Sequence, residues 1–204
     1  LIADELIKKD YEVHIYEKEK RIFNNASGNN QNRLHLGFHY PRSEKTILQS
    51  KKGFEEFKKN LGRFCKRIPK NYYFISKDKR TKLSFKRYKS VYKNLNLDFR
   101  QLEPHEYKFL NKIEGGINCK EELILFKKAK IYFGKKLKNN LHFDTEVKKI
   151  LKRKKKFEIN GNLYDVVINC SWMQYSKFSN NNYTYEYCLM LKYKSKQNNH
   201  PAVT

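Results

Sequence analysis

An α/β fold is predicted by three features of the 204-residue sequence. Residues 1–9 place apolar side chains on one helical face, and residues 11–17 then alternate apolar and polar side chains as a short strand does. Further helical and strand-like stretches follow along the chain. The sequence Asn-Gly-Asn at 160–162, between two apolar runs, is a strong signal for a hairpin turn. Helices and strands in this mixture favour an α/β architecture.

Each later element has its own local signal. A helix is expected at 43–61, where Ser43 is a suitable N-cap and apolar residues recur at helical spacing, although Gly53 weakens the middle. Residues 120–138 are expected to form the longest helix. Residues 18–43 lack periodicity, and so long an irregular stretch inside a domain is usually functional or disordered. Strands are expected at 71–76, 141–151, 156–159, 164–170 and 183–194, and helical segments at 82–94 and just after the turn 102–104.

The composition indicates a folded and strongly basic protein. Hydrophobic residues make up 39% and aromatic residues 15% of the chain, which supplies large side chains for a core. The formal net charge is +24, a value that suggests attraction to nucleic acid or another polyanion. The excess is mostly lysine, however, and it is spread along the chain with many Asn, Ile and Tyr residues, as AT-rich coding sequence would give. We therefore expect no specific nucleic-acid partner, while an anionic small-molecule substrate stays open.

The cysteines and the apolar runs narrow the class of protein further. Cys65, Cys119, Cys170 and Cys188 lie far apart without a C-x-x-C pair, which is neither zinc spacing nor a dense disulfide framework. We expect reduced thiols in a cytoplasmic protein, and no metal site. No apolar run approaches the roughly 20 residues that span a bilayer. The sequence does not predict the oligomeric state.

The strand at 11–17 ends on an acid, Glu17. In a β-α-β nucleotide-binding unit, an acid at the end of the second strand accepts hydrogen bonds from the ribose, about 20 residues after a glycine motif. Counting back from Glu17 places that motif upstream of residue 1, so the unit is expected to be incomplete in this chain. A surface glutamate without any such role fits this short pattern equally well.

The loop at 26–40 is more specific, with the sequence A-S-G-N-N-Q-N-R-L-H-L-G-F-H-Y. It resembles the flavin loop of the D-amino-acid-oxidase-like superfamily of FAD oxidoreductases, nearest to its 2-hydroxyglutarate oxidase-like members, with the pattern S/T-G-x-N-S-G-x-I-H-A-G-x-x-Y. Asn32 stands where the family has glycine, and Gln31 where it has a small residue. The residues that fall on the pattern without a gap are Ser27, Gly28, Asn30, His35, Gly37 and Tyr40, with Leu34 a conservative match.

Two later segments extend the resemblance. Residues 141–150 resemble the family strand whose valine, here Val147, presents its backbone to the adenine. Residues 165–172 (D-V-V-I-N-C-S-W) resemble the closing strand D-x-V-V-N-A-x-G-x-W of the nucleotide-binding domain, with Cys170 and Ser171 where small residues are expected. Buried β-branched residues and a turn of small residues would bring the backbone close to the ADP half of the cofactor.

The resemblance implies FAD as the cofactor and hydride transfer from a C–H next to an amine or hydroxyl of a small substrate to flavin N5. It implies catalytic roles for His35 and Tyr40, although His35 serves as well as a polar loop histidine. No covalent attachment of the flavin is expected. The residues expected to bind FAD are Glu17, Lys18, Ser27, Gly28, Asn30, Gln31, Arg33, Leu34, Val147, Cys170 and Ser171.

The resemblance also implies two domains. Residues 1–66 and 140–178 would form an incomplete, Rossmann-like FAD-binding domain, and residues 67–139 and 183–204 an inserted α+β substrate domain with a mixed sheet. Because the glycine loop and the last flavin-contacting segment would lie outside residues 1–204, we expect this stretch alone to bind FAD weakly or not at all and to be inactive.

Two alternatives remain open at this stage. A basic, non-enzymatic protein that binds nucleic acid or an anionic glycan would show strongly salt-dependent affinity, but no RNP, KH, zinc or basic-helix signature is present. A pyridine-nucleotide enzyme is compatible with Glu17, but the long loop after the second strand favours FAD, whose extended ring end needs such a lining.

Overall fold

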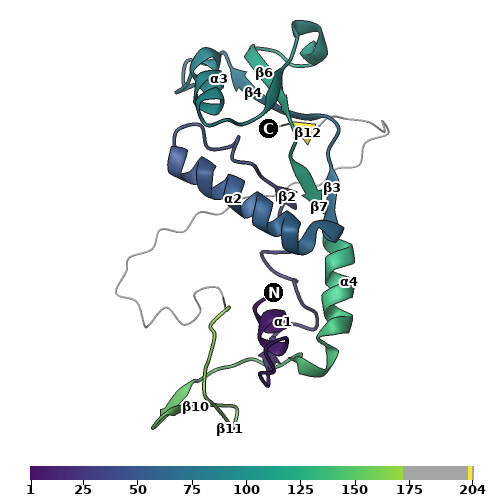
Figure 1. The fold of residues 1–204 in the computed structure, drawn as a ribbon, viewed down its shortest axis with the longest axis vertical. Helices are drawn as coiled ribbons and strands as arrows, with labels where there is room; N and C mark the ends of the chain where they lie inside the picture. Colours follow the sequence, from purple (N-terminus) through teal and green to yellow (C-terminus); the bar gives the residue numbers. More distant parts are fainter. Residues whose placement is uncertain (172–201, 204) are drawn as a thin grey trace. The chain divides into compact units, whose positions relative to one another are not determined.

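The computed structural model describes residues 1–171 together with 202 and 203 (Figure 1). The chain divides into two compact units, Leu1–Asn29 with Lys130–Lys192 and Asn30–Ala129 with Tyr193–Thr204. In this division residues 30–66 group with 67–129, whereas the resemblance assigned them to the cofactor domain. The strand expected at 183–194 and the residues Trp172 and Cys188 lie outside the described residues.

The first unit contains a short parallel strand pair. Helix α1 (Ile2–Ile7) is followed by β1 (Ile15–Tyr16), which pairs in parallel with β8 (Leu141–His142) after the short helix η3 (Lys138–Asn140). The predicted order of helix, strand and acid is thus confirmed, with a strand shorter than expected. Because parallel neighbours need a long crossover connection, this pairing is the arrangement of an α/β sheet.

The same unit carries a three-stranded antiparallel sheet, β9 (Leu151–Arg153), β10 (Lys156–Ile159) and β11 (Asn162–Tyr164), in the order β11-β10-β9. The hairpin turn between β10 and β11 is confirmed. Asn160 has φ +50° and Gly161 φ +82°, so both central residues are left-handed, as a type I′ turn requires.

Two strand predictions in this unit were wrong in extent. In the predicted strand 141–151, only the two ends pair with other strands, as parts of β8 and β9. In the predicted strand 164–170, all of which the structure describes, Tyr164 ends β11 and no strand follows it within that range. Val166 is 73% and Ile168 48% exposed, so this run is not a buried strand among the residues described. β-Branched side chains favour a strand where a pleated, half-buried surface receives them, and no neighbouring strand pairs with this run among the described residues.

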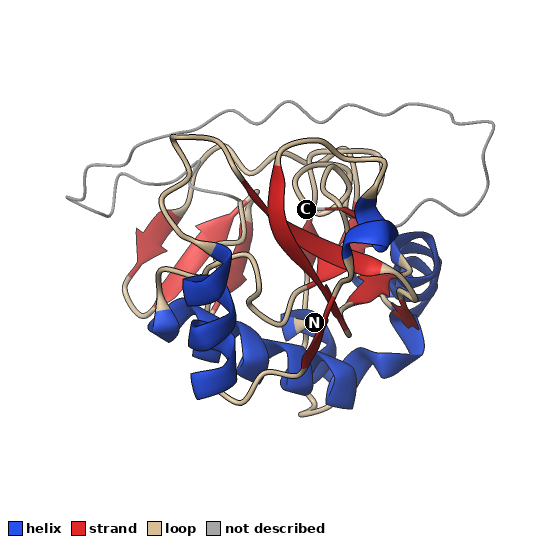
Figure 2. Cartoon of the chain, turned by 90° about the horizontal axis from the view of Figure 1, so that it is seen from above, coloured by secondary structure: helices blue, strands red, loops and turns tan. Residues whose placement is uncertain are grey.

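The second unit is built on two sheets (Figure 2). The larger sheet has the order β12-β4-β6-β5 and is mixed, since β12 runs parallel to β4 and the other pairs are antiparallel. The smaller sheet is antiparallel in the order β2-β7-β3. The strands are β2 (Arg33–Leu34), β3 (Cys65–Arg67), β4 (Asn71–Ser76), β5 (Phe99–Gln101), β6 (Ile113–Cys119), β7 (Glu122–Ile124) and β12 (Ala202–Val203).

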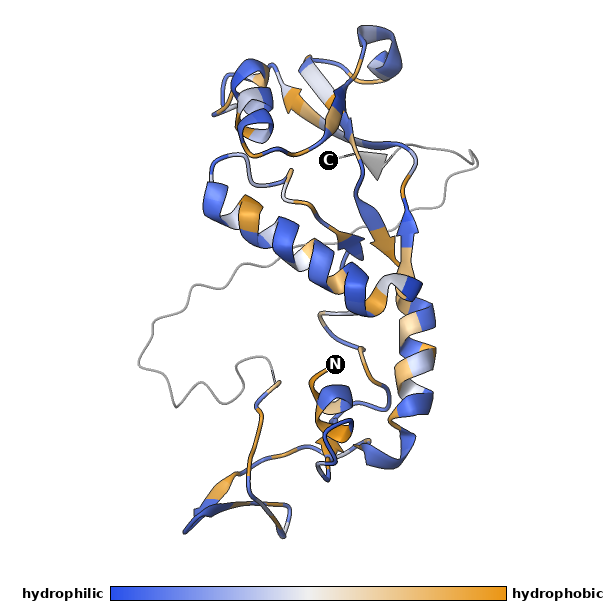
Figure 3. Cartoon of the chain, viewed as in Figure 1, coloured by the Kyte–Doolittle hydropathy of each residue, from blue (hydrophilic) through white to orange (hydrophobic). Residues whose placement is uncertain are grey.

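Helices α2 and α3 begin at serine side-chain caps, and the first of these was predicted from the sequence. The Ser43 hydroxyl accepts a hydrogen bond from Thr46 N at the start of α2 (Glu44–Leu61), and Ser84 does the same for Arg87 N at α3 (Phe85–Asn94). Figure 3 shows α2 as mostly hydrophilic with interspersed hydrophobic residues, as expected of an amphipathic helix. The short helices η1 (Gly62–Phe64) and η2 (Pro104–Tyr107) follow α2 and β5.

The helix predicted at 120–138 begins later than expected. Glu122–Ile124 forms strand β7, and α4 (Phe126–Lys136) has 11 residues, so α2 with 18 residues is longer. The local sequence suits a helix, but pairing of β7 with β2 and β3 overrides that propensity. Helix α4 contains the boundary between the two units.

The core of the second unit lies between α3 and the larger sheet. Phe85 packs so closely on β6 that a Cβ built at Gly115 would lie 2.2 Å from its ring. The cluster consists of Phe38, Ile47, Tyr73, Phe85, Tyr88, Tyr92, Leu97, Ile117 and Cys119. In the described part of the chain, no helix combines the length and apolar character needed to cross a bilayer.

Candidate functional site

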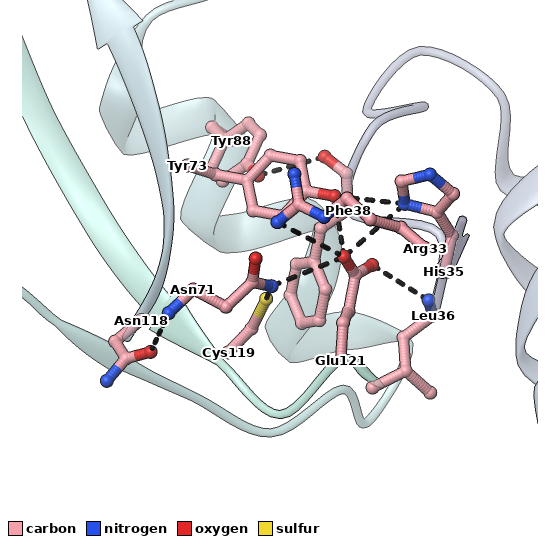
Figure 4. Close-up of polar contacts among 10 residues, drawn as sticks. All are labelled: Arg33, His35, Leu36, Phe38, Asn71, Tyr73, Tyr88, Asn118, Cys119 and Glu121. Atoms are coloured by element: carbon pink, nitrogen blue, oxygen red, sulfur yellow. Dashed lines mark hydrogen bonds and ion pairs between the residues drawn. The ribbon is translucent and has the colours of Figure 1, made fainter. Parts of the chain in front are cut away.

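A fully buried carboxylate, Glu121, lies in the turn between β6 and β7 and is 0% exposed (Figure 4). Its oxygens accept hydrogen bonds from Tyr73 Oη at 2.7 Å, from Asn71 Nδ2 at 3.3 Å and from Leu36 N at 2.8 Å. A buried charge is stable only when donors surround it in this way, so these contacts make the site a polar cluster beside the apolar core of the second unit.

His35 joins this cluster from the loop that follows β2. Its Nδ1 atom lies 3.3 Å from Glu121 Oε2 and 3.2 Å from Tyr73 Oη. The guanidinium of Arg33 is 4.0 Å from the same carboxylate and lies over the Tyr73 ring, 5.5 Å from its centroid. The His35 side chain is 32% exposed; its Nδ1 faces the cluster, and its other ring nitrogen points away from the residues of the cluster (Figure 4).

The cluster sets the charge of its members. Burial alone raises the pKa of Glu121, but hydrogen bonds from His35, Tyr73 and Leu36 N outweigh it and hold the pKa below the ordinary value. Burial and the neighbouring Glu121 charge raise the pKa of Tyr73, so its hydroxyl stays protonated and donates. The site therefore holds one buried carboxylate against one phenol and one imidazole.

The backbone that carries His35 is fixed from α3 and α2. Tyr88 Oη donates to Phe38 O at 2.9 Å, and Tyr92 Oη donates to Gly37 O at 3.3 Å. Gly37 has φ +107°, and a Cβ there would lie 2.9 Å from the Cα atom of Ile47 in α2. The positive φ angle and the close packing both require glycine. In this structure Gly37 lets the loop backbone approach helix α2 closely.

The other predicted residues of the second unit lie around the start of this loop. Asn30 Oδ1 accepts a hydrogen bond from Asn32 N at 2.6 Å, and Asn32 has φ +53°. That left-handed conformation is one that asparagine adopts more readily than most residues other than glycine. Gln31 is exposed, Leu34 is half-buried in β2, and Tyr40 is 42% exposed beside His39.

In the first unit, Glu17 follows β1 directly. One of its carboxylate oxygens accepts from Glu19 N at 2.9 Å, and its main chain exchanges hydrogen bonds with His142 O and Thr145 N. Ser27 and Gly28 lie in an exposed turn a few residues later, closed by Gly28 N donating to Asn25 O. The segment between Glu17 and Ser27 borders an open hollow of about 370 Å³. Together with Asp144, which follows β8, the residues of this segment that line it are Lys18, Glu19, Lys20, Arg21 and Asn24.

The remaining predicted residues do not meet in the described structure. Val147 is half-buried in an irregular segment, Cys170 is exposed, and Ser171 donates both N–H and O–H to Asn169 Oδ1. Their predicted binding of the cofactor stays a prediction. Among the described residues, no group of three or more His, Cys, Asp or Glu side chains is arranged to hold a metal ion.

Sequence reasoning missed Glu121, Tyr73 and Asn71 as site residues. Tyr73 and Asn71 stand in a strand whose bounds were predicted, but no periodicity distinguishes a phenol that faces a buried acid from one that packs in a core. Glu121 stands in a Lys-Glu-Glu-Leu run that favours a helix. The one available signal was the pair of adjacent acids, Glu121 and Glu122, and the helix predicted at 120–138 did not mark either of them as buried.

Comparison with known proteins gives two similarities. No protein-family model matches the chain. The chain is 31% identical over 203 residues to the FAD-dependent monooxygenase FPY4 of Fusarium mangiferae, a match that takes in 100% of the chain and 54% of that protein. The chain thus spans about half the length of this curated relative.

The fold is similar to that in the crystal structure of L-proline dehydrogenase from P. horikoshii, with a TM-score of 0.58 and 21% identity over 79% of this chain and 46% of that one. At this identity the likeness shows the fold alone. The mixed α/β fold predicted from the sequence is therefore shared with part of a solved dehydrogenase.

Proposed function

We propose that the chain is part of an FAD-dependent oxidoreductase. The observation that carries the proposal is the 31% identity along the whole chain to a protein named as an FAD-dependent monooxygenase. The likeness in fold to L-proline dehydrogenase and the resemblance of residues 26–40 to a flavin loop support it independently. A basic, non-enzymatic binding protein is less well supported, because neither similarity points to one.

The residues of the first unit fit a cofactor that carries phosphates and a ribose. Three cations, Lys18, Lys20 and Arg21, line one hollow after the β1 strand, and cations with amide donors are suited to a pyrophosphate. Glu17 uses one carboxylate oxygen for Glu19 N, which leaves the other for a ribose hydroxyl. We propose Glu17, Lys18, Ser27 and Gly28 as FAD-binding residues of this unit.

The proposal keeps the remaining roles implied by the flavin loop. Asn30, Gln31, Arg33 and Leu34 are proposed to line the cofactor, with Val147, Cys170 and Ser171 toward its ADP half. The division into an FAD domain (1–66 and 140–178) and a substrate domain (67–139 and 183–204) belongs to the same proposal.

When bound, FAD supplies the electron acceptor, and a hydride from a C–H next to an amine or hydroxyl would go to N5 of its ring. The chain's own residues would orient the substrate and handle its proton. His35 is proposed as a catalytic residue because its solvent edge is available while its other edge is held by Glu121. Tyr40, half-exposed on the same loop, is proposed to hydrogen-bond the substrate.

The test begins with the whole protein purified under native conditions. Visible absorbance of bound flavin, released as FAD on denaturation, is the expected result. A colourless protein that retards RNA on a gel would instead support the basic binding protein.

The type of oxidation is tested next, in the absence of oxygen. Loss of the flavin colour on adding a small amine or hydroxy acid supports direct hydride transfer from substrate. The name of the curated relative favours the alternative of a monooxygenase. In that case the colour would persist until NADPH is added, and the product would gain an oxygen atom only after O₂ is admitted.

A further inference from the structure

We infer that Glu121 and Tyr73 are positioning residues that hold His35 with its proton on Nδ1 and leave Nε2 as an outward-facing proton acceptor. The catalytic use of this arrangement rests on the proposed function. The arrangement itself rests on geometry within the second unit alone, and it can be tested without any cofactor.

The position of the His35 proton follows from its neighbours. Tyr73 has one hydroxyl proton, which it donates to Glu121 Oε2 at 2.7 Å, so toward His35 Nδ1 at 3.2 Å its oxygen can only accept. The carboxylate of Glu121, 3.3 Å from the same nitrogen, is also only an acceptor. Two acceptors facing one imidazole nitrogen require that nitrogen to carry the hydrogen, so in the neutral imidazole the lone pair is on Nε2.

The rest of the surroundings leave Nε2 open. The His35 side chain is 32% exposed, and among the described residues no hydrogen bond to Nε2 is found. The charged and titratable groups around the imidazole are Glu121, Tyr73, Arg33 and His39, whose ring centroid is 6.1 Å from that of His35. Of these, only the carboxylate and the phenol contact Nδ1.

Stability alone gives little reason for such a cluster. A buried charge loses its hydration, and well-packed apolar residues of similar volume often stabilise a fold at least as well. Glu121 and Asn71 are both 0% exposed, and the Asn71 side-chain amide donates a hydrogen bond to the Glu121 carboxylate. A carboxylate that is buried, charged and aimed at a half-exposed imidazole is the arrangement by which enzymes orient a histidine base.

In the proposed reaction this device handles the proton that the flavin does not take. As a substrate carbinol is oxidised, its C–H hydrogen leaves with both electrons as hydride to the flavin. Its O–H proton passes to Nε2 of His35, and the C=O bond forms. The imidazolium so produced keeps its Nδ1–H on Glu121, whose negative charge offsets the new positive charge. With an amine substrate, the N–H proton takes the same route.

The tautomer is measured directly on the wild-type protein. Histidine labelled with ¹⁵N in the ring reports by NMR which nitrogen carries hydrogen, and the His35 signals are identified by their loss in His35→Gln. The expected result, at a pH where the imidazole is neutral, is a protonated Nδ1 and an unprotonated Nε2. A His35 with hydrogen on Nε2, or one averaging both tautomers as an exposed histidine does, overturns the inference.

Variants then test the catalytic role. With whole, flavin-loaded protein and a substrate that bleaches it, Glu121→Gln should lower kcat about a hundredfold, the lower end of what general base catalysis contributes. The double variant His35→Gln/Glu121→Gln should be no slower than His35→Gln, because both changes remove the same function. Equal kcat for Glu121→Gln and wild type, or fully additive losses, would overturn the role.

Controls separate positioning from folding and from the proposed function. Glu122→Gln removes the neighbouring carboxylate, which pairs with Lys58 at 2.6 Å and does not contact His35, and should leave kcat within about twofold. Tyr73→Phe keeps the ring and serves if Glu121→Gln does not fold. It leaves Glu121 as the acceptor at Nδ1, so the proton should stay on Nδ1, and a Tyr73→Phe protein with hydrogen on Nε2 overturns the inference. A protein without flavin that shows the expected tautomer defeats the proposed function only, and a flavoprotein with the other tautomer defeats this inference only.

Discussion

Replacing Tyr88 by phenylalanine should destabilise the second unit, because the Tyr88 hydroxyl is the donor for Phe38 O in the loop that carries His35. The oxygen–oxygen distance is 2.9 Å, and both residues are buried, at 2% and 1% exposure. Burial also raises the pKa of Tyr88, as expected of a hydroxyl kept from water. Removing it leaves a buried carbonyl without its donor, which costs about 1–3 kcal/mol.

Two matched variants make the size of this effect interpretable. Tyr92→Phe removes a longer hydrogen bond, 3.3 Å to Gly37 O, and should cost less, about 0.5–1.5 kcal/mol. Tyr11→Phe removes a hydroxyl from a side chain that is 61% exposed, and should stay within about 0.5 kcal/mol of wild type. Since the chemical change is the same in all three variants, their differences depend on the burial of each hydroxyl and on the hydrogen bond that it makes.

The assay is urea unfolding followed by tyrosine fluorescence and far-ultraviolet circular dichroism, with the free energy of unfolding taken from the midpoint and slope. A Tyr88→Phe protein within about 0.5 kcal/mol of wild type, or one no less stable than Tyr11→Phe, would refute the view that α3 fixes the His35 loop.

Three further predictions concern stability. Gly115→Ala should lower the free energy of unfolding by about 1–3 kcal/mol, since its Cβ would meet the Phe85 ring at 2.2 Å. Gly53→Ala in α2 is the matched control: no atom lies within 4 Å of its added Cβ, and it should raise the free energy of unfolding by about 0.5–1 kcal/mol. The midpoints of urea unfolding compare the two variants. Because the folded-state pKa of Glu121 is lowered from 4.5, its contribution to stability is present above that pH and is lost as the pH falls through the folded value. Unfolding free energies between neutral pH and pH 3 should therefore fall less steeply in Glu121→Gln, and parallel curves would contradict this. Gly161→Ala places a side chain at φ +82° and should cost roughly 1–2 kcal/mol of hairpin stability, seen as faster hydrogen exchange of the Phe157 and Ile159 amides.

The sequence predicted correctly those features that depend on neighbouring residues alone. Ser43 caps α2 as predicted, because its hydroxyl satisfies an amide of its own first turn. The hairpin at Asn160-Gly161 forms because both residues tolerate positive φ. The bounds of β4 and β10 agree with the apolar runs at 71–76 and 156–159.

At two positions of the flavin-loop pattern, the structure shows a positive φ angle. Asn32, at the place of a family glycine, has φ +53°, and Gly37 has φ +107°. The pattern also pointed to His35, which the structure brings against the buried acid. It carried no information on what holds the imidazole, because those residues belong to other segments of the chain.

The sequence by itself therefore determined the mixed α/β class, the Ser43 cap of α2, the hairpin turn and the place of His35, since each depends on residues a few positions apart. Only the tertiary structure decided the site. Leu36 and Glu121 are 85 positions apart and Tyr73 and Glu121 are 48 apart, yet they share one carboxylate. A helix-forming Lys-Glu-Glu-Leu run becomes a turn and a strand because β2 and β3 pair with it. A charge can be buried at position 121 only because donors from two distant segments, residues 33–36 and strand β4, converge there.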